Sequence, residues 1–190
     1  MVTYLVIAAG LFNLFATVSY TRDTFLGRNK PNRVSWILWT VAPLIAAAAA
    51  FTKGAGWVAF PILISGLAPA IVLIASFFNP KAYWKLGPLD YLCGACSVFA
   101  LILWGITQEA AVAILFALLS DLFATLPTLI KAWKHPETES ALNYIGALVN
   151  SLAAFLVMQT FDFANLAFPV YLVCANVSII LALLHGTKRR

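Results

Sequence analysis

AAVAILFALLSDLFATLPTLI, residues 110–130, is the stretch that decides the fold. Its 21 residues are enough for a helix that crosses a bilayer. Asp121 is the twelfth residue and the only charged one, so we expect its carboxyl near the middle of the membrane. A carboxylate at that depth costs about 2.5–3.5 kcal/mol on insertion scales, which favours a position facing a polar interior rather than lipid.

The composition of the whole chain indicates an integral membrane protein with the lipid bilayer as a partner. Hydrophobic residues make up 63% of the 190 residues, charged residues make up 10%, and the mean hydropathy is +0.92. These values exclude an ordinary soluble domain. The net charge of +5 does not indicate a nucleic-acid partner, because the basic residues lie in short turns between apolar stretches. We expect no nucleic acid, no metal and no cofactor.

Seven apolar stretches have lengths suited to membrane-spanning helices, which predicts an all-α fold. They are residues 2–20, 34–52, 57–78, 88–106, 110–130, 140–158 and 165–184. With seven spans, eleven lysines and arginines fall in turns or tails on one side, and Lys53 alone falls on the other. The positive-inside rule then places the N-terminus outside and the C-terminus in the cytoplasm, in a multi-pass protein of the cell (inner) membrane.

The chain also carries traces of an internal duplication. The string Leu-Phe-Ala-Thr at residues 14–17 returns at 122–125, an offset of 108, and Ala-Phe-Pro at 59–61 returns at 167–169 with the same offset. We therefore predict two parallel three-helix repeats joined by a linker helix, a three plus one plus three arrangement. The predicted units are residues 1–80, 81–108 and 109–190. In one class of transporters, such parallel repeats hold the binding site between them at mid-membrane.

This plan resembles the SWEET and PQ-loop family of membrane transporters. Pro127-Thr128 stands where the family has its Pro-Gln pair, and Asn176 matches the family's asparagine on the last helix. Pro43 and Pro127 match two of the hinge prolines of SWEETs, whereas Ser19 and Leu148 occupy the other two hinge positions. The resemblance implies seven helices, an outside N-terminus, and transport of a small solute such as a sugar by alternating access.

Polar residues at one depth form the candidate substrate site. Asn13, Asp121, Asn150 and Asn176 are each the eleventh or twelfth residue of their span, so their side chains are expected in one layer. The alternative for the asparagines is that they only join helices through hydrogen bonds worth about 0.6 kcal/mol each. For Asp121 the functional interpretation is favoured, because an ionisable group is a costly way to join helices.

Two aromatic residues and two prolines complete the candidate site. Trp39 and Tyr144 take equivalent places in the two repeats and could stack on a solute, although an aromatic anchor at the membrane interface is the alternative. Pro43 and Pro127 each remove a backbone donor inside a predicted helix, which permits either a hinge or a static kink.

The predicted function is transport of a small solute, sugar-like or amino-acid-like, rather than catalysis. Asp121 is the one titratable residue of the polar layer, and desolvation disfavours its charged form, so we expect it to exchange a proton during transport. One alternative is a membrane receptor or assembly partner with the same fold. A redox enzyme using Cys93 and Cys96 is a further alternative, although both cysteines fall in the linker span among small residues. Self-association into a homo-oligomer stays open.

Overall fold

The computed structural model describes residues 2–52, 60–107, 110–156, 158 and 161–188. These residues form seven α-helices and two short 3₁₀ turns, and no strand occurs among them. The prediction of an all-α protein with seven helices is therefore confirmed. The helices are α1 (Val2–Phe25), α2 (Arg33–Thr52), α3 (Phe60–Phe78), α4 (Pro88–Ile106), α5 (Ala110–Lys134), α6 (Ala141–Ala154) and α7 (Phe163–Lys188), and the 3₁₀ turns are η2 (Pro80–Ala82) and η3 (Pro136–Thr138).

The helix ends differ from the predicted spans in an informative way. Helix α4 has the predicted bounds, whereas α1, α5 and α7 continue four or more residues beyond the predicted span at their C-terminal ends. Backbone hydrogen bonds do not require apolar side chains, so a helix extends past the last apolar residue into polar sequence. Helix α6 ends at Ala154 and is shorter than its predicted span. Lys53, Arg189 and Arg190, which entered the predicted charge distribution, lie outside the described residues.

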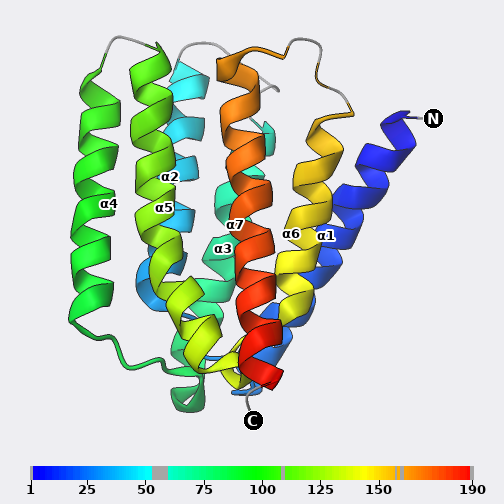
Figure 1. Ribbon diagram of the computed structural model, residues 1–190, viewed down its shortest axis with the longest axis vertical. Helices are drawn as coiled ribbons and strands as arrows, with labels where there is room; N and C mark the ends of the chain where they lie inside the picture. Colours follow the sequence, from blue (N-terminus) through cyan, green and yellow to red (C-terminus); the bar gives the residue numbers. More distant parts are fainter. Residues whose placement is uncertain (1, 53–59, 108–109, 157, 159–160, 189–190) are drawn as a thin grey trace.

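The helices lie side by side, and α1 begins at the end of the bundle opposite to the one where α7 finishes (Figure 1). Helix α1 packs against α3 and α6, and α2 packs against α3, α4 and α5. Helix α5 also packs against α4 and α7, and α7 packs against α6. Because successive helices alternate in direction, the turns after α1, α3 and α5 gather at the end where α7 finishes. We call this the basic end, because these turns and the flanking helix ends carry the described lysines and arginines.

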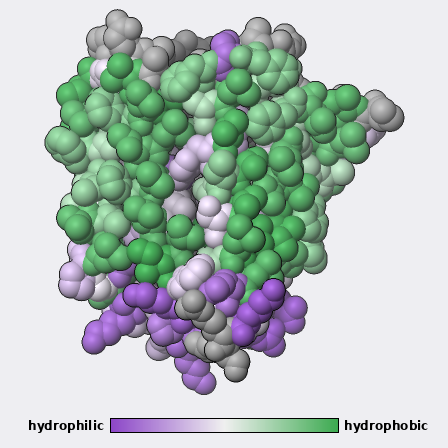
Figure 2. Space-filling view, in the orientation of Figure 1, coloured by the Kyte–Doolittle hydropathy of each residue, from purple (hydrophilic) through white to green (hydrophobic). Residues whose placement is uncertain are grey.

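The outer surface of the bundle suits a lipid environment. Four helical segments are long and apolar enough to cross a membrane: Tyr4–Phe25, Pro88–Ile106, Ile114–Lys134 and Leu166–Lys188. Three shorter apolar segments lie in α2, α3 and α6 within the described residues. Figure 2 shows apolar residues covering the side of the bundle and hydrophilic residues gathered at the basic end. An apolar face of this extent is not expected on a protein surrounded by water.

Close contacts and caps fix the helices relative to one another. Gly146 lets α6 approach α1 closely, because a Cβ atom at this position would lie 2.7 Å from the Cβ of Ala16. Asp90 in the first turn of α4 accepts hydrogen bonds from the Gly87 amide and from the Asn32 side chain, each at 2.6 Å. Asn32 also caps α2 through the amide of Val34 at 3.1 Å. The start of α4 is thereby tied to the start of α2.

Candidate functional site

Asp121 lies near the middle of α5 and contacts α7 through hydrogen bonds. The hydroxyl of Tyr171 on α7 donates to Asp121 Oδ2 at 2.7 Å, and the hydroxyl of Thr125 donates to the same oxygen at 3.3 Å. The other oxygen, Oδ1, accepts no hydrogen bond from the described residues. A carboxylate can accept about four hydrogen bonds, so this one has unused capacity in an apolar bundle.

A cavity of about 310 Å³ lies against Asp121. Five helices line it: α2, α3, α4, α5 and α7. Two lining residues are large aromatics, Trp104 from α4 and Phe168 from α7, and two are serines. Asp121 is the one ionisable residue among the described lining residues, which are Leu38, Ala42, Pro43, Ser65, Leu101, Trp104, Ala117, Ser120, Asp121, Ala124 and Phe168. We call this space the Asp121 cavity.

The Asp121 cavity has the features of a small-ligand site. Its volume is at the lower end of the roughly 300–1,000 Å³ typical of ligand pockets. Most lining side chains are apolar, and the polar ones are few. Leu101 and Trp104 belong to the C-terminal part of α4, and Phe168 belongs to the N-terminal part of α7, so the cavity extends away from the basic end. The site can hold a compact ligand with one polar or charged group directed at Asp121.

The predicted polar layer is distributed over different faces of the bundle. Asn13 and Asn150 lie at the contact of α1 and α6, where the Asn13 Oδ1 atom is near Gly146 and the Asn150 Oδ1 atom is near Gly10. Asn176 is buried in α7, and its Nδ2 donates to the Leu172 carbonyl oxygen at 2.8 Å. None of these three asparagines is among the described residues that line the Asp121 cavity.

The predicted hinge prolines lie inside two helices that pack against each other. Pro43 is inside α2 and lines the Asp121 cavity, and Pro127 is inside α5, six residues after Asp121. Each proline removes one backbone donor from its helix. Helices α3 and α7 contain prolines of the same kind, Pro69 and Pro169.

Tyr144 belongs to a second polar group, located at the basic end. Glu139, just before α6, accepts hydrogen bonds at Oε2 from the hydroxyls of Tyr20 at 2.7 Å and Tyr144 at 2.8 Å. Its Oε1 forms an ion pair with Lys131, which also donates to the Lys30 carbonyl oxygen. We call Tyr20, Lys131, Glu139 and Tyr144 the Glu139 cluster. All four side chains are buried, and the cluster joins α1, α5 and α6.

Most of the Glu139 cluster was not predicted from the sequence. The prediction that Lys131 lies in a turn is wrong: Lys131 lies in the last turn of α5 and is only 2% exposed. Its burial is tolerated because Glu139 supplies the opposite charge. The available signal was the pair of tyrosines at the ends of apolar stretches, since a buried tyrosine hydroxyl usually has a polar partner.

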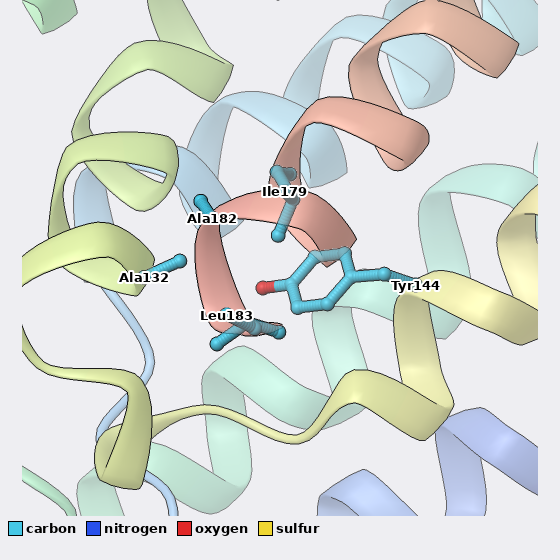
Figure 3. Packing of buried hydrophobic residues seen from close by; sticks show 5 residues of the cluster. All are labelled: Ala132, Tyr144, Ile179, Ala182 and Leu183. Carbon is cyan, nitrogen blue, oxygen red and sulfur yellow. The ribbon is translucent and has the colours of Figure 1, made fainter. Parts of the chain in front are cut away.

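Aromatic and apolar side chains fill the rest of the bundle interior near the basic end. Figure 3 shows the ring of Tyr144 extending from α6 towards Ile179, Ala182 and Leu183 of α7, with Ala132 of α5 nearby. A second cluster contains Tyr20, Trp36 and Val72, with the Tyr20 and Trp36 rings 5.1 Å apart. Trp39 packs against both clusters. It therefore lies between the helices of the first cluster, α5, α6 and α7, and those of the second, α1, α2 and α3. Side chains fill the interior around the Glu139 cluster, whereas a cavity lies beside Asp121.

The alternative of a redox enzyme depends on Cys93 and Cys96. Cys93 is buried and Cys96 is partly buried, one turn apart on α4, and both are free thiols. Among the described residues, no three histidine, cysteine, aspartate or glutamate side chains are grouped so that they could hold a metal ion.

Comparison of the chain with family models, with curated proteins and with solved structures found no match. The functional assignment therefore depends on the geometry of the two polar groups.

Proposed function

We propose that the protein is a membrane transporter for a small solute that works by alternating access, with the three plus one plus three architecture of the SWEET and PQ-loop family. One observation carries the proposal: Asp121, with one oxygen not hydrogen-bonded by the described residues, lines a cavity between helices from both halves of the chain. A charged group in a membrane-spanning helix commonly marks a substrate or ion pathway.

The packing of the helices supports the proposed repeats. Helix α3 packs against α1 and α2, and in the same way α7 packs against α5 and α6. The contacts between the halves also correspond, because α1 packs against α6 and α5 packs against α2. Near the basic end, Tyr20 of α1 bonds Glu139 before α6, and Thr128 of α5 bonds Ser35 of α2 at 2.9 Å. Helix α4 packs against α5 and α2, as a linker helix would.

The uneven filling of the interior supports alternating access. In transporters with parallel repeats, one half rocks against the other around a fixed site. Here the Glu139 cluster and the aromatic side chains close the basic end, which we propose faces the cytoplasm, while a cavity remains beside Asp121. Pro43 and Pro127 are the proposed hinges, because they lie in α2 and α5, one of the helix pairs that contact each other across the halves. Opening the basic end would require the Glu139 cluster to separate.

Proton coupling is proposed for Asp121. The cavity supplies no cationic side chain from the described residues to balance a carboxylate at this depth. A proton from one side of the membrane can neutralise the carboxylate instead. It can leave on the other side once the cavity opens there. Asn13, Asn150 and Asn176 do not titrate and are not alternatives for this role.

Uptake into liposomes tests the proposal. Purified protein in liposomes would be offered a panel of sugars, amino acids and small organic ions, with and without a pH gradient across the bilayer. The parent chain should accumulate at least one of them when the gradient is present. Asp121→Asn should not accumulate that solute, because the variant cannot carry a proton. If the solute is neutral, the variant should still exchange it at equal concentrations. Asp23→Asn, which removes an acid at the surface paired with Arg28, is the control and should behave like the parent. Failure of the parent to move any solute would contradict the proposal.

A further inference from the structure

The charge balance of the Asp121 cavity indicates the chemistry of its ligand. Helix α5 packs against α2, α4 and α7, and α3 also lines the cavity. Tyr171 on α7 is the one titratable side chain among the described residues that contacts the Asp121 carboxyl. From α2, α3 and α4, the described lining residues carry no charge and no titratable group. A carboxylate in such a cavity needs a proton or a cation beside it, since an isolated buried charge is very costly.

The aromatic lining favours an organic cation over a metal ion. Trp104 and Phe168 line the same cavity as Asp121, from α4 and α7. An ammonium group is attracted to the face of an aromatic ring as well as to a carboxylate, and aromatic pockets are a known means of recognising quaternary ammonium ligands. The apolar lining residues, such as Leu38, Leu101 and Ala117, suit alkyl substituents and offer no side-chain oxygen to a small metal ion.

The hydrogen-bonding capacity of the cavity disfavours a sugar. A sugar carries several hydroxyl groups, and each one left without a partner in an apolar site lowers affinity. Beside Asp121, the polar side chains that line the cavity are Ser65 and Ser120. Ser120 is already hydrogen-bonded to Ser97, at 2.9 Å between the two Oγ atoms, and its carbonyl oxygen accepts from the same hydroxyl.

We infer that the Asp121 cavity binds a small organic cation with one positive charge and apolar substituents, such as a quaternary ammonium ion or a tertiary amine. This inference names the substrate class of the proposed transporter and rests on that function only where it concerns transport. The cation and a proton compete for the same carboxylate, so the proton leaves Asp121 for solvent when the cation binds. One cation is thereby exchanged for one proton.

Choline and its neutral isostere 3,3-dimethylbutan-1-ol are the probes for a binding test. The two molecules have the same shape, and only choline is charged. Calorimetric titration of the purified full chain should show choline binding at least about tenfold more tightly than the isostere. The affinity for choline should fall with falling pH, approaching about tenfold per pH unit when protons occupy the carboxyl. Equal affinity for the two probes, or no binding of choline, overturns the inference.

Four variants test which residues provide the preference. Asp121→Asn should abolish the advantage of choline over its isostere, and Trp104→Leu should weaken choline binding by about tenfold. Phe99→Leu, an exposed aromatic on the same helix as Trp104, is the matched control and should bind choline like the parent. If Asp121→Asn does not fold, Ala117→Leu provides a second test. It fills part of the cavity and keeps the acid, so it should weaken the binding of both probes. A preference for choline that persists in Asp121→Asn, or unchanged binding in Ala117→Leu, contradicts the assigned site.

Transport measurements separate this inference from the proposed function. If choline binds with the stated preference but neither choline nor any solute of the panel is moved across liposomes, the transporter proposal fails and the cation site stands. If the liposomes accumulate a neutral solute and choline does not bind, the cation site fails and the transporter proposal stands.

Discussion

Glu139 and Asp121 are two acidic residues of this apolar bundle whose surroundings differ. Glu139 has both oxygens occupied, one by the hydroxyls of Tyr20 and Tyr144 and the other by the ammonium group of Lys131. Asp121 has one oxygen hydrogen-bonded by Tyr171 and Thr125, and it lines a cavity. The first arrangement stabilises one packing of the helices. The second leaves a carboxyl group able to bind something else, so the partners of a buried acid distinguish a structural role from a functional one.

The largest effect is expected on breaking the Glu139 cluster from one side. In Lys131→Met, the Glu139 carboxylate keeps its tyrosine partners but loses its counter-charge, and both ion-pair side chains are almost completely buried. Removing one member of a buried pair costs about 3–5 kcal/mol. Thermal unfolding in detergent should show a correspondingly large loss of stability. The control is Arg28→Met, which removes an exposed pair with Asp23 and should cost about 0–1 kcal/mol. Equal losses in the two variants would mean that Glu139 is not specially stabilised.

A smaller effect is expected for the tyrosines, and it should differ between the two acids. Tyr20→Phe removes a fully buried hydrogen bond to Glu139 and should cost about 1.5–3 kcal/mol, as for other bonds to charged groups. Tyr171→Phe removes the corresponding bond to Asp121, but the Thr125 hydroxyl still donates to the same oxygen, so we expect a smaller loss of about 0.5–1.5 kcal/mol. Unfolding measurements give both values. Uptake by Tyr171→Phe should also show a shifted pH dependence. If Tyr171→Phe instead loses much stability and its uptake keeps the pH dependence of the parent, Asp121 has a structural role like that of Glu139.

The smallest effect is expected from residues that belong to neither acid. Cys93 and Cys96 lie on α4 and contribute no side chain to the described lining of the Asp121 cavity. Changing both cysteines to alanine should leave liposome uptake within a factor of about two of the parent, because surface and packing changes away from a site have small effects. Loss of uptake at normal expression would instead indicate thiol chemistry and would weaken the contrast drawn between the two acids.

The sequence predicted the helices better than the site, for a physical reason. Hydropathy and span length identify each apolar helix, and α4 was located residue for residue. Counting along a span gives the depth of a side chain but not its direction, since each residue turns the helix by about 100°. Asn13 and Asn150 therefore lie at the α1–α6 contact and not beside the Asp121 cavity. Asp121 could be chosen as a candidate functional residue because a charge within the membrane is costly whichever way the side chain points.

The partners of the two acids could not be predicted from local sequence. Tyr171 is 50 residues from Asp121 along the chain, and Tyr20 is 119 residues from Glu139. Such pairs depend on how the helices are rotated against one another, which hydropathy does not specify. Trp104 was missed for the same reason: its place in the span gave no sign that it lines a cavity.

Infrared difference spectroscopy tests most directly whether Asp121 exchanges a proton. Spectra of the parent chain would be recorded at high and low pH, and the absorption of protonated carboxyl groups would be compared among variants. We predict that part of this pH-dependent absorption is lost in Asp121→Asn. It should remain in the double variant Lys131→Met, Glu139→Gln, which removes both charges of the buried pair together. Identical spectra for the parent and Asp121→Asn, or loss of the same absorption in the double variant alone, would contradict this account.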